Sequence, residues 1–183
     1  MSAAFAVMFA ALVAGQNSRI THDELLALVN GARERSGVSP LKKDPRLGRA
    51  AQARADDMAR RGYFAHNSPG GKTPWDFIKE TGYRYEAAGE NLATGQRTAE
   101  EVQRSWQRSS GHRANQLNRR FTETGIGIAK TRSGVVVVQI FASPLLRREG
   151  VDDAAVNDGN VLLVVEHVGH GRGVQIFGEG VAP

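Results

Sequence analysis

The sequence predicts an α+β protein in which helices fill much of residues 22–110 and a β-hairpin follows them. Two observations lead to this prediction. Polar capping residues precede apolar repeats of helical period at several points in the first part of the chain. From residue 124 onward the residues alternate at period two and then form a run of valines, a pattern typical of β-strands.

The length and composition favour one main domain without covalent cross-links. A chain of 183 residues can bury roughly 70% of its unfolded surface, so it can fold without disulfides. The chain contains no cysteine. This excludes a disulfide scaffold, a thiolate zinc site and a cysteine nucleophile.

Charge is unevenly distributed along the chain. Residues 1–143 carry 21 basic and 13 acidic side chains, whereas residues 144–183 carry 3 and 6. A basic main domain can meet an anionic lipid surface or an acidic envelope polymer. Nucleic acid is a less favoured partner, because the arginines are not interleaved with the aromatic residues that stack on single-stranded bases.

The first 15 residues are apolar and uncharged. This run is shorter than the roughly 20 residues that a membrane-spanning helix needs. It is similar to the apolar part of a signal peptide, and residues 13–15 are small enough for cleavage, although no basic residue precedes the run. We therefore interpret residues 1–17 as a signal peptide of a secreted or cell-envelope protein. A plain N-terminal apolar helix and a mis-set start codon are the alternatives.

The first helix of the main domain is predicted to begin at His22. Thr21 and Glu24 form a capping box, in which each side chain can satisfy a backbone N–H group. Apolar residues then recur at helical spacing. Gly37 is a suitable stop for this helix.

The second helix is predicted to run from Pro45 to about Gly62. Asp44 caps it, and Pro45 occupies the first helical position, where its missing N–H group costs nothing. Apolar residues follow at steps of four and three. The charged side chains on the opposite face are Arg54, Asp56, Asp57 and Arg61.

A loop and a short helix come next. Residues 69–71, Pro-Gly-Gly, turn the chain away from a helix, so that His66 lies in a loop and can face a cleft. Thr73 and Pro74 begin a short helix that runs through Glu80 and ends at Gly82.

Residues 89–91 lie between helical patterns and are predicted to form a loop. Within it, Glu90 stands beside apolar residues. A carboxylate in such a position must find a cation, a metal or N–H donors, because an unpaired buried charge is strongly destabilising. The alternative to a functional role is that Glu90 accepts N–H groups of its own loop.

Thr98 is predicted to cap a further helix, along which Trp106 and Ser109 share a face. Gly111 is expected to break this helix, so that His112 follows at the break. A side chain at such a position can point into a pocket.

The β-structure is predicted in two places. Residues 125–128 and 135–141 form a hairpin around a turn at residues 131–134. Two further strands, residues 160–168 and 173–177, are expected to form a hairpin in the C-terminal extension, residues 144–183. The two histidines of that extension are expected to flank its turn rather than to bind a metal.

Three motifs, taken together, resemble those of the CAP superfamily in its cysteine-free bacterial form. They are Tyr63-Phe64-Ala65-His66-Asn67-Ser68, Gly89-Glu90-Asn91-Leu92-Ala93, and Trp106 followed by Ser109-Ser110-Gly111-His112-Arg113-Ala114-Asn115. The superfamily comprises the SCP/TAPS, cysteine-rich secretory, antigen 5 and pathogenesis-related 1 proteins. The likeness covers residues 20–143. It implies a three-layer α-β-α sandwich with a small central antiparallel sheet, in which the predicted hairpin is central.

The resemblance also implies a site. In the family, two histidines and one or two glutamates line a cleft and can hold a divalent cation such as zinc. The residues that correspond are His66, Glu90 and His112, which are the metal-ligand and catalytic candidates. Ser109 stands where other members carry a second glutamate. The expected cleft-lining residues are Tyr63, His66, Glu90, Trp106, Ser109 and His112.

Three functions follow from this resemblance and from the residues. The preferred one is an exported binding protein whose cleft takes a small apolar or lipid-like ligand and a divalent metal. A metal-assisted hydrolase is the second, since two imidazoles and one carboxylate form the ligand set of a catalytic zinc site. It is less favoured because a second carboxylate is missing. The third is an envelope module that binds polyanions through its basic surface. The sequence leaves the oligomeric state open.

Overall fold

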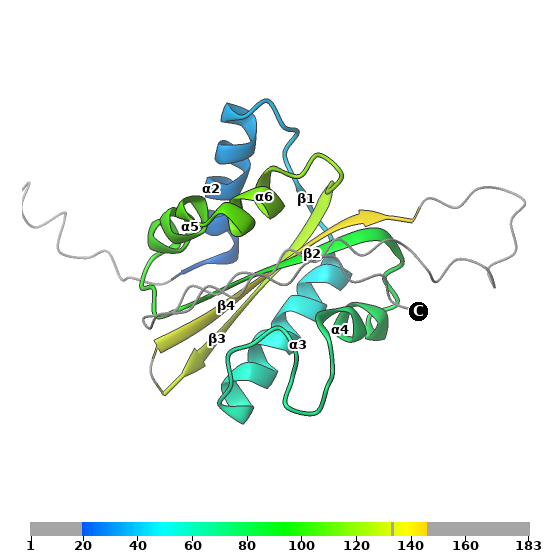
Figure 1. The fold of residues 1–183 in the computed structure, drawn as a ribbon, viewed down its shortest axis with the longest axis vertical. Helices are drawn as coiled ribbons and strands as arrows, with labels where there is room; N and C mark the ends of the chain where they lie inside the picture. Colours follow the sequence, from blue (N-terminus) through cyan, green and yellow to red (C-terminus); the bar gives the residue numbers. More distant parts are fainter. Residues whose placement is uncertain (1–19, 133, 146–183) are drawn as a thin grey trace, which may run out of the picture.

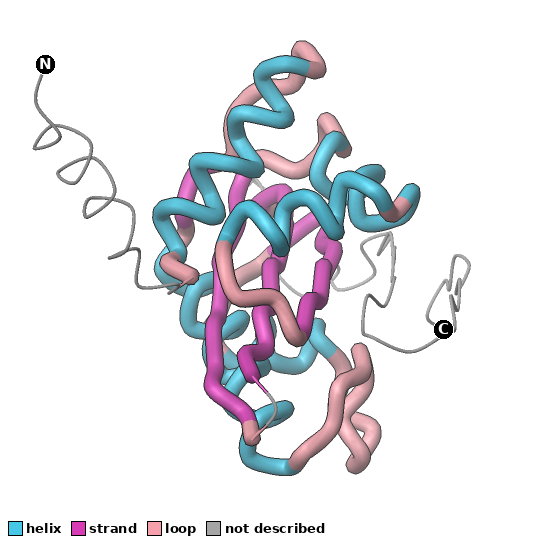
Figure 2. The backbone as a smooth tube through the Cα atoms, turned by 90° about the vertical axis from the view of Figure 1, so that its left-hand side faces the viewer, coloured by secondary structure: helices cyan, strands magenta, loops and turns pink. Residues whose placement is uncertain are grey.

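A computed structural model describes residues 20–132 and 134–145 of the chain. Within these residues the chain forms three layers, with α2, α5 and α6 on one side of a four-stranded sheet and α3 and α4 on the other (Figure 1). In Figure 2, turned by 90°, the strands lie between helices. The predicted three-layer α-β-α sandwich is therefore confirmed.

The helices are α2 (His22–Arg35), α3 (Pro45–Arg61), α4 (Pro74–Glu80), α5 (Ala99–Arg108) and α6 (Ser110–Leu117). The strands are β1 (Lys42–Lys43), β2 (Tyr85–Thr94), β3 (Glu123–Thr131) and β4 (Gly134–Pro144).

The order of strands in the sheet is β1-β3-β4-β2. β1 pairs with β3 in parallel, and the other pairs are antiparallel. The predicted hairpin is confirmed as β3 and β4. Because β4 is central and covered on both faces, its valine run needs no alternation of apolar and polar residues.

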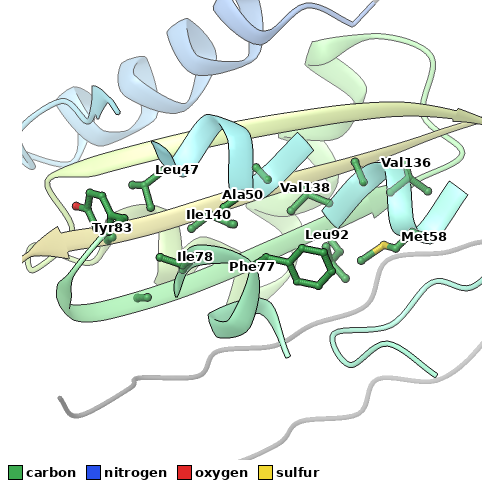
Figure 3. Close-up of a cluster of buried hydrophobic side chains, with 14 of the residues drawn as sticks. Leu47, Ala50, Met58, Phe77, Ile78, Tyr83, Leu92, Val136, Val138 and Ile140 are labelled. Atoms are coloured by element: carbon green, nitrogen blue, oxygen red, sulfur yellow. The ribbon is translucent and has the colours of Figure 1, made fainter. Parts of the chain in front are cut away.

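Two apolar clusters hold the layers together, one on each face of the sheet. Figure 3 shows the cluster on the α3 and α4 side, where Leu47, Met58 and Phe77 pack against Val138 and Ile140 of β4. The cluster on the other face contains Trp106, which is fully buried. The sheet therefore has no solvated face along its central strand.

The predicted helix starts are confirmed. Thr21 accepts the N–H group of Glu24 at 3.3 Å, and Asp44 accepts those of the first turn of α3. α3 ends at Gly62, whose φ of 68° is the left-handed conformation that favours glycine. α4 begins with a capping box between Thr73 and Asp76.

Two local predictions are wrong. Residues 89–91 lie in β2 rather than in a loop, because they pair with β4, with Glu90 opposite Ile140. The helix that Thr98 caps ends at Arg108 rather than at Gly111. Ser109 has extended backbone angles and caps α6 through its hydroxyl group, and Gly111 lies inside that helix.

Two glycines allow α3 to lie directly on β3. A Cβ atom at Gly125 would come within 2.1 Å of the carbonyl carbon of Leu47, and one at Gly127 within 2.2 Å of the carbonyl oxygen of Ala51. Only glycine permits this approach. Three residues beyond Ala51, Arg54 reaches across to Glu90 in β2.

The predicted N-terminal segment, residues 1–17, and the predicted C-terminal hairpin, residues 160–177, lie outside the described residues. Within residues 20–132 and 134–145, no helix combines the length and the apolar character needed to span a bilayer.

Candidate functional site

The candidate site is built around Glu90, which lies in β2 with a fully buried side chain. Its Oε2 atom accepts a hydrogen bond of 3.0 Å from Nε of Arg54, and Nη2 of Arg54 lies 3.5 Å from Oε1. Arg54 comes from α3 and is also fully buried. A buried carboxylate needs a cation or several donors, and here a guanidinium supplies both.

The same guanidinium positions the loop that carries His66. Its Nη2 atom donates to the carbonyl oxygen of Ala65 at 2.7 Å and also to that of His66. Its Nη1 atom donates to the hydroxyl group of Tyr63 at 2.9 Å. Arg54 therefore fastens both ends of residues 63–66 to α3, which places the imidazole of His66 against Glu90.

His66 and Glu90 form a direct pair. Nδ1 of His66 lies 2.6 Å from Oε1 of Glu90, and 11% of the histidine side chain is exposed. An ionised carboxylate only accepts hydrogen bonds, so Nδ1 carries the proton. In neutral His66, Nε2 is then an acceptor. This atom is buried and has no hydrogen-bond partner among the described residues.

The network continues from Tyr63 to Asp57. The Tyr63 hydroxyl donates to Oδ2 of Asp57 at 2.8 Å, and the Ser68 hydroxyl lies 3.1 Å from the same oxygen. Burial acts to raise the pKa of Asp57, but the hydrogen bonds from Tyr63 and Ser68 outweigh it and lower the pKa below its ordinary value. Burial raises the pKa of Tyr63, so this tyrosine stays a neutral donor.

His112 is held by a second set of contacts. Its Nδ1 atom lies 2.8 Å from the Ser109 hydroxyl, and its carbonyl oxygen accepts a 3.1 Å hydrogen bond from the side chain of Asn91. Asn115 donates to the carbonyl oxygen of Glu90 at 3.2 Å and to Asn91 at 2.9 Å. α6 is thereby fastened to β2 at the motif that contains Glu90.

Trp106 joins the same region through its indole nitrogen, which donates to the carbonyl oxygen of Leu92 at 3.0 Å. Its ring centroid lies 6.3 Å from that of His112. All three motifs recognised in the sequence therefore meet at β2. Tyr63 takes part through its hydroxyl group and is half-buried, whereas Trp106 is fully buried in the core.

The two histidines are held from opposite faces of β2. Successive side chains of a strand point to opposite faces, and Glu90 points to α3 whereas Asn91 points to α6. β2 is the edge strand of the described sheet. A cleft that joins His66 to His112 must therefore pass along the outer edge of β2.

The metal expectation was for His66, Glu90 and His112 around one ion. Among the residues that the structure describes, no group of three or more such side chains lies close enough to hold a metal. Both carboxylate oxygens of Glu90 are occupied by Arg54 and His66. The donor set that remains is the Nε2 atom of His66 together with His112, and the metal role of these residues stays a prediction.

Sequence reasoning missed Arg54 and Asp57, which it placed on the charged face of α3. Both are buried, at 0% and 7% exposure, whereas Asp56 and Arg61 of the same face are exposed. The helical spacing contains the missing signal, since Arg54 lies three residues after Ala51 and four before Met58, both core residues. An arginine at the border of an apolar stripe indicates a buried partner.

The comparisons with known proteins agree with this fold. The model of the cysteine-rich secretory protein family (CAP) matches residues 26–141. The protein YkwD of Bacillus subtilis is 42% identical over 110 residues, which are 60% of this chain and 43% of that protein. The membrane protein YlbC of the same organism is 30% identical over 105 residues, covering 57% of this chain and 30% of that protein.

Among solved structures, an extracellular protein with an SCP domain from Bacillus anthracis superposes with a TM-score of 0.61 at 29% identity. The superposition covers 66% of this chain and 39% of the Bacillus anthracis protein. An outer surface protein of Borrelia burgdorferi has the same TM-score at 20% identity, and the superposition covers 69% of this chain and 97% of that protein. At this identity it supports the fold alone. The chain spans less than half of the length of YkwD, YlbC and the Bacillus anthracis protein.

Proposed function

The chain belongs to the cysteine-rich secretory protein (CAP) family, and on this basis we propose that it is an exported binding protein. In this proposal the binding site is a cleft along the outer edge of β2, next to His66. Two observations support export. The first residues are similar to a signal peptide, and a structural neighbour at 29% identity is an extracellular protein.

The observation that carries the binding role is the state of His66. Its Nδ1 atom is engaged by Glu90, and its buried Nε2 atom has no hydrogen-bond partner in the described part of the chain. An unsatisfied buried polar atom costs about 1–3 kcal/mol. A protein that builds a buried ion pair to hold this imidazole in place presents Nε2 to a ligand.

The proposed ligand class rests on the aromatic residues near His66 in the chain. Phe64 and Trp75 are half-buried and pack at the margin of the apolar cluster, as does the ring of Tyr63. A site with one polar contact and several aromatic neighbours suits a small apolar or lipid-like molecule that carries one hydrogen-bonding group. The polar group would bind Nε2, and the apolar part would cover the aromatic rings.

A divalent metal fits the same nitrogen. A metal-bound histidine commonly donates its other ring N–H group to a carboxylate, which orients the ring and raises its basicity. His66 and Glu90 already have this arrangement. When bound, the metal would supply a Lewis acid that attracts an anionic or carbonyl group of the ligand. His66 and His112 would hold it, and Glu90 would act from outside the coordination sphere.

Calorimetry with zinc tests the metal role. The wild-type protein should gain about 2.7 kcal/mol of stability at a zinc concentration one hundred times the Kd. His66→Ala should abolish this gain. Asn67→Ala, an exposed neighbour in the same loop, should keep it. Equal zinc stabilisation of wild type and His66→Ala would remove the metal from the proposal.

Binding of the neutral apolar dye Nile red tests the ligand role. Phe64→Ser should weaken dye binding at least fivefold, since it removes a half-buried aromatic ring two residues before His66 in the chain. His66→Ala should change the affinity for the dye by no more than about twofold, because binding of an apolar dye does not depend on a hydrogen bond to Nε2. Undiminished binding by Phe64→Ser would place the apolar ligand elsewhere on the protein.

Hydrolysis ranks below binding because Glu90 is not free to act as a general base. A general base must be able to receive a proton from the attacking water, and Glu90 already accepts hydrogen bonds from Arg54 and His66. Turnover of an ester or peptide substrate that Glu90→Gln abolishes would reverse this ranking.

One observation favours polyanion binding as a second function. Residues 97–120 contain six arginines and two glutamates, and all six arginines are exposed. None forms a salt bridge within residues 20–132 and 134–145. Retention on an anionic envelope polymer should then fall steeply with salt. Salt-independent retention would contradict this role.

A further inference from the structure

An apolar hollow of about 460 Å³ opens at the edge of the sheet that lies opposite to β2. Its walls come from Leu26 of α2, Pro45 and Gly48 of α3, and Gly125 and Ile126 of β3. Since β1 and β2 form opposite edges of the described sheet, this hollow is separate from the cleft beside His66. Its volume lies in the range of about 300–1,000 Å³ that is usual for small-molecule sites.

The hollow exists because β1 is only two residues long. β1 pairs with β3 at Glu123 and Thr124, so among the strands that the structure describes the following residues of β3 have no neighbour on that side. At Ile128 the side chain of Gln52 replaces a strand, since its amide accepts the N–H group at 3.1 Å and donates to the carbonyl group at 3.0 Å. Gln52 therefore blocks the addition of a peptide strand along this edge, which favours a small ligand in the hollow.

Gly48 keeps the hollow open. It lies in the first turn of α3, where glycine destabilises a helix relative to alanine. Its backbone does not have a positive φ, and a Cβ atom would meet nothing within 4 Å. At Gly125, by contrast, a Cβ atom would collide with α3. Neither a clash of a Cβ atom nor the backbone conformation requires glycine at position 48, and the missing side chain leaves the space beside it open.

The charges at the opening indicate what the hollow accepts. Asp44 is bound by Arg46 at 2.8 Å, and Lys43 is paired with Asp23. Arg49, which also lines the hollow, is exposed and forms no salt bridge within the described residues. The opening thus has one uncompensated positive charge above apolar walls.

We propose that this hollow is a second ligand site, which binds the single apolar chain of an anionic amphiphile and places its anionic group at Arg49. Burial of the alkyl chain against Leu26, Pro45 and Ile126 supplies the affinity. The guanidinium of Arg49 supplies the preference for an anion, in the charge-assisted geometry that arginine forms with carboxylates and phosphates. The site does not depend on the cleft beside His66, so either can fail without the other.

Calorimetric titration of the full chain with dodecanoate and with dodecanol, its neutral counterpart, tests the proposal. We expect a dodecanoate site that Gly48→Leu weakens at least tenfold, since the leucine side chain would fill the hollow, and any dodecanoate bound in the cleft beside His66 should stay unaffected by this substitution. Gly31→Leu is the matched control, because it changes another helical glycine outside the hollow, where a Cβ atom meets only the flexible end of Arg35 at 3.3 Å. This control should bind as the wild type does.

Two further variants identify the source of the binding. Arg49→Gln should lower affinity for dodecanoate about fivefold and leave that for dodecanol unchanged. His66→Ala should leave unchanged the binding that Gly48→Leu removes. Loss of dodecanoate binding in His66→Ala but not in Gly48→Leu would place the amphiphile in the cleft and overturn this inference, while the proposed function would stand.

The other occupants of the hollow predict different results. If a second copy of the chain fills it, Gly48→Leu should change the oligomeric state in size-exclusion chromatography and should leave the binding of both amphiphiles unchanged. If the apolar run of residues 1–15 fills it, Gly48→Leu should leave the binding of both amphiphiles unchanged and should increase proteolysis of that run. Either result would overturn the inference. Circular dichroism should show that Gly48→Leu stays folded, since leucine is the better helix former.

Discussion

Replacement of Arg54 by methionine removes the guanidinium that pairs with the buried carboxylate of Glu90. Methionine has a similar length and no charge, so the apolar part of the side chain is retained. The structure predicts the loss of the 3.0 Å contact to Glu90 and of the hydrogen bonds to Tyr63 and to the carbonyl groups of residues 65 and 66. Of its partners, Glu90 keeps only His66 on its side-chain oxygens.

The expected loss of stability is about 3–5 kcal/mol, the usual cost of breaking a buried ion pair by removing one partner. No reduction for solvent screening applies, because both side chains are 0% exposed. A domain has a total stability of about 5–15 kcal/mol, so the variant should lose a substantial part of its free energy of unfolding. Most of this loss reflects the unpaired charge of Glu90.

A double-mutant cycle measured by urea denaturation separates these contributions. Arg54→Met should be the most destabilised variant, and adding Glu90→Leu should recover about 1–3 kcal/mol, because the unpaired charge is then absent. Lys79→Met, on the exposed side of α4, is the control and should change stability by less than about 0.5 kcal/mol. The reasoning would be refuted by a loss below about 1 kcal/mol for Arg54→Met, or by additive effects of the two substitutions.

Three further predictions concern other elements. Ser109→Ala should destabilise the protein by about 0.5–2 kcal/mol in urea denaturation, since it removes the cap of α6, whereas Ser39→Ala, at an exposed serine that caps none of the described helices, should have almost no effect; equal losses would contradict the capping role. Asp57 has a pKa lowered from 3.8; its ionised form therefore contributes stability above pH 3.8 that is lost as the pH falls through the lowered pKa, and Asp57→Asn should show a shallower loss of melting temperature between about pH 4 and 2. Gly48→Ala should raise stability by about 0.5–1 kcal/mol, because alanine is the better helix former and a Cβ atom there meets nothing; a loss would mean that the hollow is tighter than the structure shows.

The elements that could be predicted are those whose signals are local. Thr21, Asp44 and Thr73 bind N–H groups within three residues of themselves. Both partners of each hydrogen bond therefore lie in the same short stretch of sequence. The hairpin of β3 and β4 is local in the same sense, because its turn joins neighbouring segments. The three motifs of the candidate site were also recognisable, since each is a continuous run.

The predictions that failed depend on distant partners. Residues 89–91 form a strand because β4, about fifty residues later, pairs with them, as Glu90 does with Ile140. Arg54 is buried because a carboxylate 36 residues away in the chain faces it. A pattern along the chain predicts that a charged helix residue is exposed to solvent, because it contains no information on the side chains of the element that packs against the helix.

The sequence by itself determined the α+β class, the starts of the helices and the identity of His66, Glu90 and His112 as candidates. Only the tertiary structure decided that Arg54 holds Glu90 and the loop of His66, and that the two histidines approach β2 from opposite faces. The physical reason is that side chains alternate along a strand. The neighbouring residues Glu90 and Asn91 therefore contact helices in different layers, α3 and α6.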